Sequence, residues 1–226
     1  MRVAVKIGGH LFPFELDAAR ISSYAEVFLK LRSEGHQILA VAGGGEVSRK
    51  YISAARQLGA TEAFCDELGI KVACLNARLL ITKLGGDAYP RPPSNNEELR
   101  LALASGKIVV LGGLHPGQST NAVAAVASEE MRADILINAT NVEGVYSADP
   151  KKDPKAKLLD EVKSSKLIDL LGSKSFGAGG YELFDMVAIK IVERSKIPVV
   201  IIDGRDPENI IRVIRGEKLG TRLIYD

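Results

Sequence analysis

The sequence predicts an α/β fold, a three-layer αβα sandwich around a central, mostly parallel sheet. Three observations predict it: short apolar runs rich in β-branched residues, longer stretches of helical periodicity between them, and glycine clusters where the two kinds of segment meet. Strands that are apolar along nearly their whole length are typical of parallel sheets covered by helices on both faces. With 226 residues and no long linker or repeat, the chain is expected to form one domain, residues 1–226.

Strands are predicted where short apolar runs are rich in Val, Ile and Leu. These runs cover residues 2–7, 37–42, 108–111, 135–139 and 199–202. Helices are predicted where apolar residues recur at every third or fourth position and a glycine or a capping residue marks one end. The helical stretches cover residues 17–35, 46–58, 62–83, a segment that starts at 119, and 183–195.

Two segments depart from this alternation of strand and helix. Residues 141–159 combine glycine and proline with several Lys and Asp, which predicts a hairpin or an excursion from the sheet. Residues 176–181 are rich in glycine, which predicts a mobile loop ahead of the last helix. Because both segments follow the core strand at 135–139, we expect a soft division of the domain near Asn141.

Composition excludes several classes of protein. The chain has 30 Lys+Arg and 28 Asp+Glu, which gives a formal net charge of +2. This charge is too small to attract nucleic acid or an acidic membrane by bulk electrostatics. No apolar run is long enough to span a bilayer, and the first residues lack a signal-peptide pattern. Cys65 and Cys74 are too few for a disulfide framework or a metal site. We therefore expect a cytoplasmic protein that binds neither nucleic acid nor membrane.

Glycines follow three of the predicted strands, at the sheet edge where α/β proteins bind ligands. They are Gly8 and Gly9, then Gly43, Gly44 and Gly45, then Gly112, Gly113 and Gly117. Without a Cβ, glycine lets backbone N–H groups approach phosphate oxygens, and a following helix N-terminus adds further donors. Lys6 ends the first strand and Arg49 lies in the first turn of the second helix, so cations stand beside these loops. The pattern favours phosphoryl transfer, which needs its charge neutralised and its reactants aligned.

Two glycine loops resemble known nucleotide-binding motifs, but each departs from its motif at one position. Residues 112–119 read G-G-L-H-P-G-Q-S, a P-loop pattern in which Gln118 replaces the phosphate-binding lysine. Residues 43–48 hold an incomplete dinucleotide fingerprint with Ser48 at its third glycine, although Asp66 lies where a ribose-binding acid is sought. A Walker-type ATP site and a nicotinamide-dependent oxidoreductase are both disfavoured.

Four stretches carry a resemblance to a known family. They are Lys6-Ile7-Gly8-Gly9; Gly43-Gly44-Gly45 with Arg49; Gly112-Gly113-Leu114-His115-Pro116-Gly117-Gln118-Ser119-Thr120; and Thr140-Asn141-Val142-Glu143-Gly144-Val145-Tyr146-Ser147-Ala148-Asp149-Pro150. In their order and spacing they resemble the amino-acid kinase family, and within it the archaeal type of uridylate (UMP) kinase. The resemblance covers essentially the whole chain.

The resemblance implies an activity and an assembly. The activity is transfer of the γ-phosphoryl group of ATP to UMP, giving UDP and ADP in pyrimidine nucleotide (CTP/UTP) biosynthesis, with Mg²⁺ bound mainly through the ATP phosphates and no metal held by protein ligands. The assembly is a homohexamer built from dimers. Residues 1–139 would form roughly the acceptor-binding part of the domain, and residues 140–226 roughly the ATP-binding part.

The same resemblance assigns roles to residues. Lys6 and Arg49 would be catalytic. The ATP phosphates would be surrounded by Gly9, His10, Gly45 and Arg49, and the adenosine would be held by Thr140, Asn141, Tyr146 and Asp149. UMP would contact Gly44, Asp66, Leu114, His115, Pro116, Gly117, Gln118, Ser119 and Thr120.

The chain departs from the family pattern at three positions. His10 stands where serine is frequent, and Asn121 stands where many relatives have Asp. Near Asp185, where family members that phosphorylate acetylglutamate carry a second lysine, this chain has no equivalent. Lys6, Arg49 and Mg²⁺ would therefore bear more of the charge.

Two alternatives on the same fold stay open. One is a kinase for another small phosphate, such as isopentenyl phosphate, and the other is a non-catalytic nucleotide-binding or storage protein. Asp66 and the polar run Gln118-Ser119-Thr120 suit a ribose and a pyrimidine better than an isoprenoid tail. The presence of Lys6 and Arg49 favours catalysis over storage.

Overall fold

A single seven-stranded sheet runs through the molecule in the order β3-β2-β1-β4-β6-β7-β5. The computed structural model describes residues 1–148, 153, 155–171 and 184–226. The strands are β1 (Arg2–Ile7), β2 (Gln37–Ala42), β3 (Val109–Leu111), β4 (Ile135–Thr140), β5 (Glu161–Lys163), β6 (Val199–Asp203) and β7 (Thr221–Ile224). Neighbouring strands from β3 to β6 are parallel, whereas β7 is antiparallel to β6 and parallel to β5. The predicted mostly parallel sheet is confirmed.

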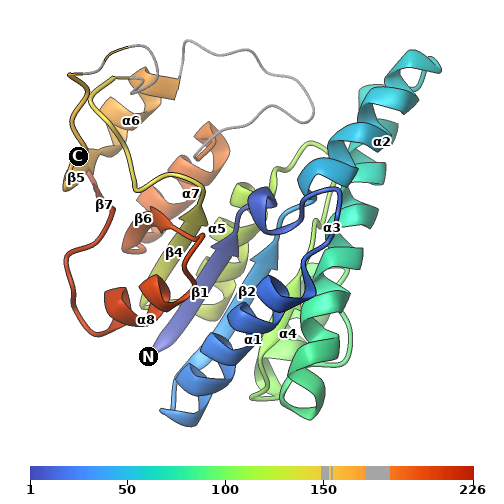
Figure 1. Cartoon of the computed structure of the whole chain (residues 1–226), viewed down its shortest axis with the longest axis horizontal. Helices are drawn as coiled ribbons and strands as arrows, with labels where there is room; N and C mark the ends of the chain where they lie inside the picture. The colour runs from blue at the N-terminus through green and yellow to red at the C-terminus, as the bar shows by residue number, and fades with distance from the viewer. Residues whose placement is uncertain (149–152, 154, 172–183) are drawn as a thin grey trace.

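Helices cover both faces of the sheet (Figure 1). They are α1 (Ala18–Ser33), α2 (Gly45–Gln57), α3 (Glu62–Leu84), α4 (Asn96–Ala104), α5 (Thr120–Met131), α6 (Ser164–Leu171), α7 (Met186–Ser195) and α8 (Glu208–Ile214), with 3₁₀ turns at Gly9–Leu11 and Gly85–Asp87. The apolar faces of α1, α3 and α8 meet one side of the sheet, and those of α4, α5 and α7 meet the other. These two cores make the three-layer sandwich that the sequence predicts.

Alternation along the strands decides which side chains enter which core. In β1, Val3, Val5 and Ile7 pack toward α1 and α3, whereas Ala4 packs toward α5 and α7. Because side chains alternate along a strand, Lys6 lies on the same face as Ala4. A lysine is thereby directed into the layer formed by α5 and α7.

Helix α2 packs on α3 through a small apolar cluster of its own. Ile52 and Ala55 of α2 contact Cys65 of α3, and the two helices project together beyond the sheet (Figure 1). The pair forms one wall above the carboxyl ends of β1 and β2.

The five predicted strands and the predicted helices are present, with boundaries that shift by a few residues at most where they are described. Residues 141–159 form a hairpin in their described part, since Tyr146 and Leu158 make an antiparallel bridge and the Leu159 N–H donates to the Val145 carbonyl over 2.9 Å. Residues 176–181 lie outside the described part of the chain. Strands β5 and β7 and helices α4, α6 and α8 were not predicted.

The chain order of the strands creates a crevice above β1. From β1 the chain adds β2 and β3 on one side and then returns to place β4 on the other, so a topological switch point lies between β1 and β4. The loops here are tied together: the Gly8 N–H donates to the Ala139 carbonyl over 2.8 Å, and the Gly43 N–H to the Ile7 carbonyl over 3.1 Å.

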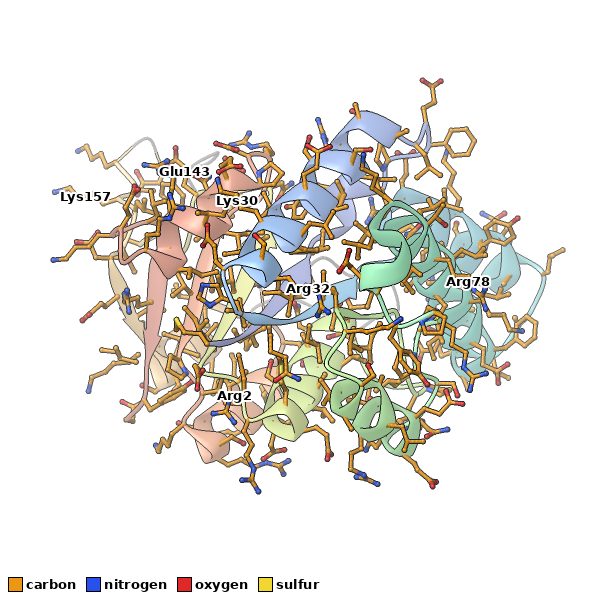
Figure 2. The ribbon with its side chains drawn as sticks, turned by 90° about the horizontal axis from the view of Figure 1, so that it is seen from below. Arg2, Lys30, Arg32, Arg78, Glu143 and Lys157 are labelled. Carbon is orange, nitrogen blue, oxygen red and sulfur yellow. The ribbon has the colours of Figure 1, made fainter. Side chains whose placement is uncertain are left out.

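The opposite end of the sheet, seen from below in Figure 2, has a different character. Arg2 and Arg32 are labelled there, and both are engaged: Arg2 pairs with Asp134 at 2.9 Å and Arg32 with Asp87 at 3.2 Å. In the described residues, no helix combines the length and the apolar character that crossing a membrane requires. The glycine loops predicted to bind phosphate lie at the upper end, in the crevice.

Candidate active site

A cleft of about 220 Å³ opens at the carboxyl ends of β1 and β2, between the α2–α3 wall and the N-termini of α5 and α7. Nine of the residues predicted for the site line it together: Lys6, Gly9, Gly44, Gly45, Arg49, Asp66, Gln118, Ser119 and Thr120. Residues more than 100 positions apart in the sequence thus face one cavity. The topological switch point is the reason, because it collects the loops of several strands there.

Lys6 is the buried cation of this cleft. Its side chain is only 7% exposed, and its strand neighbours are Val41 of β2 and Asn138 of β4. Burial lowers the pKa of Lys6 from 10.5 to about 8, and the Asp185 carboxylate opposes the drop. The ammonium group is therefore mostly charged at pH 7, in surroundings that weaken its hydration and strengthen its pull on an anion.

Two glycines bring the loops after β1 and β2 into contact. A Cβ on Gly9 would come within 3.0 Å of the Gly45 Cα atom. Gly45 has a φ of +69°, and a Cβ there would overlap the carbonyl oxygen of Phe12. Only glycine tolerates both the positive φ and the close contact with Phe12 at position 45. Gly45, at the start of α2, also lines the cleft.

Arg49 follows on α2 and extends its guanidinium over the same loops. One terminal nitrogen lies 3.8 Å from the point where a Gly9 Cβ would stand. The side chain is exposed and has no ion-pair partner among the described residues. Its charge is available to an anion in the cleft.

Asn76 on α3 holds the second glycine loop in place. Its buried side-chain amide donates to the carbonyls of Gly43 and Gly44 over 2.8 and 3.2 Å. This residue was missed by sequence reasoning. A polar residue on the buried face of an apolar helix was the available signal, because a buried amide needs partners.

Asp66 joins the α3 wall to the loop after β3. One carboxylate oxygen accepts from the Gly117 N–H over 2.8 Å, and the side chain lines the cleft. The bond fixes the direction of the carboxylate and leaves acceptor capacity for a ligand hydroxyl.

Ser119 and Asp185 cap two helices whose N-termini meet in the cleft. The Ser119 hydroxyl oxygen accepts from the N–H groups of Asn121 and Ala122 at the start of α5, over 3.0 and 3.1 Å. An Asp185 carboxylate oxygen accepts from the Ala188 N–H at the start of α7 over 2.9 Å. The Ser119 hydroxyl also donates to Asp185. Two positive helix ends are thereby aimed at the space beside Lys6.

The remaining predicted residues that the structure describes are not part of the cleft lining. His10 packs against Gly8, and burial is the main cause of its lowered pKa. Leu114 is a core residue, whereas His115, Pro116 and Gly117 are exposed beside the entrance. Thr140 is buried at the end of β4, Asn141 is exposed, and the Tyr146 hydroxyl donates to Glu143 over 2.7 Å. Asp149 lies outside the described residues.

Gly112 and Gly113 have a packing role. A Cβ on Gly112 would overlap the backbone of Cys74, and one on Gly113 would come within 2.7 Å of Ile70. Both glycines let α3 lie directly on the end of β3. The same contact places Ile70 and Ala73 in the cleft, where with Ile52 they supply an apolar surface that the sequence did not reveal.

Ser48, Asn121 and Asp185 also line the cleft without having been predicted as site residues. Asp185 entered the sequence analysis only as a place where a lysine is missing. A capping position before a helical run was its available signal. Asp66 and Asp185 are the carboxylates of the lining, and the described residues contain no group of three or more His, Cys, Asp or Glu able to hold a metal ion.

These features suit the cleft to a phosphorylated ligand. A buried ammonium, a free guanidinium and the N-termini of α2, α5 and α7 converge on one cavity. A fixed carboxylate and an apolar wall lie opposite them. Such an arrangement stabilises negative charge that is transferred between two bound groups, because its dipoles need no reorganisation during the reaction.

Comparison with known proteins gives consistent results. The model of the amino acid kinase family matches residues 1–203. A uridylate kinase of Methanobrevibacter smithii is 45% identical over 224 residues, with 99% of each chain covered. A uridylate kinase of Methanocorpusculum labreanum is 48% identical, with 97% of this chain and 94% of the relative covered.

A solved structure agrees with these relatives. The crystal structure of uridylate kinase from Archaeoglobus fulgidus superimposes with a TM-score of 0.87 at 38% identity, covering 99% of this chain and 100% of the other.

Proposed function

Since the chain belongs to the amino acid kinase family, we propose that it transfers the γ-phosphoryl group of ATP to UMP, giving UDP and ADP in pyrimidine nucleotide (CTP/UTP) biosynthesis. The observation that carries the proposal is the buried Lys6 between two glycine loops, in a chain that matches uridylate kinases along its full length. Such enzymes are ATP-dependent nucleoside monophosphate kinases.

Lys6 and Arg49 are the catalytic residues of this proposal. The transferring phosphoryl group carries charge on its equatorial oxygens, and no covalent intermediate on the protein is needed. Lys6 meets that charge from within the protein and Arg49 from the exposed side of the cleft. Their positions on separate elements, β1 and α2, let them hold the group from two directions.

ATP lies along the loops after β1, β2 and β4. Its phosphates are surrounded by Gly9, His10, Gly45 and Arg49, and its adenosine is held by Thr140, Asn141, Tyr146 and Asp149. Gly9 and Gly45 line the cleft, which supports the first set, because glycine lets backbone N–H groups approach phosphate oxygens closely.

UMP lies against α3 and the loop after β3. Asp66 accepts from the ribose hydroxyls, Gly44 meets the nucleotide, and Leu114, His115, Pro116, Gly117, Gln118, Ser119 and Thr120 form the loop around its phosphate and base. The Asp66–Gly117 hydrogen bond supports this arrangement, because it ties the carboxylate to the loop.

Mg²⁺ enters with ATP, bound mainly through the phosphates. Asp66 and Asp185 are the only carboxylates among the described lining residues, and each is already hydrogen-bonded. This donor set fits an ion that keeps its own phosphate and water ligands. When bound, Mg²⁺ supplies further positive charge to the phosphates.

We further propose a homo-oligomer, a hexamer built from dimers. Support comes from α3, where Phe64, Leu75 and Leu79 are exposed along one face. If two copies of α3 packed antiparallel, Phe64 would face Leu79 of the other copy. Leu75→Glu is expected to lower the sedimentation coefficient. Leu101→Glu, on α4 and also 62% exposed in the wild type, should not, and the reverse result would reject this face.

We place the protein in the cytoplasm. Both cysteines are free thiols, Cys65 buried and Cys74 half-buried, as a reducing compartment keeps them. The placement of the two substrates also divides the single domain into two parts. Residues 1–139 form roughly the acceptor-binding part, and residues 140–226 form roughly the ATP-binding part.

ADP release, measured with ATP and Mg²⁺ against UMP, CMP, dUMP and isopentenyl phosphate, tests the function. Fast turnover with UMP is the expected result. Turnover with isopentenyl phosphate alone would keep the ATP site but overturn the acceptor. ATP binding without any turnover would assign the protein to the storage class.

A further inference from the structure

Thr221 is a buried hydroxyl that joins the last strand of the sheet to the hairpin at 141–159. It is the first residue of β7 and is fully buried. Its hydroxyl oxygen accepts from the Val145 N–H over 2.8 Å, and its hydroxyl donates to the Leu159 carbonyl over 2.6 Å. One side chain therefore binds both strands of the hairpin at their base.

Two glycines make this contact possible. A Cβ on Gly144 would overlap the Thr221 hydroxyl, so only glycine lets the hairpin come this close. Gly220, with a φ of +68°, lies where a Cβ would overlap the Ile201 carbonyl. Ile201 is also the residue of β6 that pairs with Thr221. Thr221 is thus fixed to β6 through its backbone, and the hairpin is fixed to Thr221 through its hydroxyl.

The hydrogen bonds between Thr221 and the hairpin lie next to the residues assigned to adenosine. Tyr146 follows Val145 directly, and its bridge to Leu158 stands one step beyond the Val145–Leu159 pair that Thr221 holds. The end of β6 is tied to the same region, because the Gly204 N–H donates to the Thr140 carbonyl over 2.6 Å. The direction in which the hairpin leaves the sheet therefore depends on the bonds at its base.

We propose that Thr221 is a positioning residue for ATP: its hydroxyl sets the hairpin so that Asn141 and Tyr146 meet the adenosine. The inference rests on the proposed function for the identity of the nucleotide. Thr221 touches no substrate. It acts through the hairpin, and the acceptor side of the cleft does not depend on it.

The contribution of the Thr221 hydroxyl can be tested separately from that of the rest of the side chain and of the backbone. The pairing of Thr221 with Ile201 uses backbone groups, which Thr221→Val retains along with nearly the same side-chain volume. That substitution leaves the Val145 N–H and the Leu159 carbonyl without their buried partner. Thr221→Ser restores the hydroxyl. Thr82→Val is a matched control, because the Thr82 hydroxyl donates only to Arg78 of its own exposed helix surface.

The test is isothermal titration of each variant with ATP and Mg²⁺ in the absence of UMP, and separately with UMP. For Thr221→Val the ATP dissociation constant should rise about tenfold, the change expected if the free energy of about one buried hydrogen bond at the base of the hairpin is lost from ATP binding. The UMP dissociation constant should stay at the wild-type value. Thr221→Ser and Thr82→Val should bind both nucleotides as the wild type does.

Several outcomes would overturn the inference. They are unchanged ATP affinity in a folded Thr221→Val, an equal loss of ATP and UMP affinity, and a Thr221→Ser variant as weak as Thr221→Val. If Thr221→Val does not fold, Gly144→Ala replaces it, because its methyl group pushes the hairpin away from an intact hydroxyl and should weaken ATP binding alone. A wild type that binds ATP but does not phosphorylate UMP would overturn the proposed acceptor, while the ATP titrations would still decide the role of Thr221.

Discussion

The cleft around Lys6 and the hairpin at 141–159 lie at the same end of the sheet but are held in different ways. The cleft is fixed by several close contacts: glycines too close to their neighbours to carry a Cβ, the buried Asn76 amide, and two helix caps bonded to each other. The hairpin is attached at its base through Thr221, and Asn141 and Lys157 on it are exposed.

The difference matches the demands of the two ends of ATP. Charge stabilisation at a transferring phosphoryl group requires donors that are already in place, because reorganisation would add to the barrier. An adenosine needs affinity more than such precision. The comparison therefore predicts that substitutions in the cleft change rate and stability, and that substitutions on the hairpin change nucleotide affinity.

The largest expected effect on stability comes from the charge of Lys6. Burial holds the pKa of Lys6 at about 8 against 10.5 when unfolded, so the unfolded chain binds more protons between these values. At pH 7 the buried charge costs the ligand-free protein roughly 3 kcal/mol, which Lys6→Met should recover. The exposed hairpin residue Lys157, labelled in Figure 2, is the control, and Lys157→Met should leave stability nearly unchanged.

Urea unfolding of both variants at several pH values measures this. The gain from Lys6→Met should be full at pH 7 and should fall as pH rises from 8 toward 10.5, where the wild-type lysine becomes neutral in both states. A loss of stability in Lys6→Met at pH 7 would mean that Lys6 is compensated within the ligand-free cleft, and the contrast with the hairpin would weaken.

Many of the residues that line the cleft could be predicted from the sequence alone. Lys6, Gly44, Gly45 and Arg49 were found because strand ends and glycine loops leave a local signature, and Asp66 because of its spacing from the loop. Asn76 and Asp185 were missed because their roles depend on what packs against α3 and α7, which no local pattern encodes. The strands β5 and β7 were missed because, unlike the similarly short β3, they have no continuous apolar run: β5 reads Glu-Val-Lys and β7 begins with Thr-Arg.

Thr221 illustrates the same limit on the hairpin side. Its partners Val145 and Leu159 are 76 and 62 residues away in the chain, and no local pattern near Thr221 predicts these contacts. The hairpin itself was predicted from its composition, but its attachment was not.

Glycine substitutions give the next effect. Gly45 and Gly59 both have positive φ, but a Cβ at Gly45 would overlap Phe12 whereas a Cβ at Gly59 would meet open space. Gly59→Ala should lower the free energy of unfolding by about 1 kcal/mol, the cost of a left-handed backbone with a side chain. Gly45→Ala should lose about 1 kcal/mol more from steric overlap. Equal losses in urea unfolding would show that the loop contact is loose.

The smallest effect concerns the pH dependence of the reaction. The Asp185 carboxylate raises the pKa of Lys6, so Asp185→Asn should lower it. Because Lys6 acts when protonated, the alkaline fall of kcat/KM for ATP should move to lower pH. Asn still caps a helix, so α7 keeps its start. Asp66→Asn is the control and should raise the KM for UMP without moving that fall, and a shift of the same size in both variants would remove Asp185 from its assigned role.

Single-turnover transfer from ATP to UMP, measured by rapid quench at saturating nucleotide in wild type and Lys6→Met, tests whether Lys6 stabilises the transferring phosphoryl group. In Lys6→Met the transfer rate should be lower by about 10³-fold, as for the loss of a preorganised charge-stabilising group, with the UMP dissociation constant unchanged. A Lys6→Met variant that transfers the phosphoryl group at close to the wild-type rate would contradict this role of Lys6.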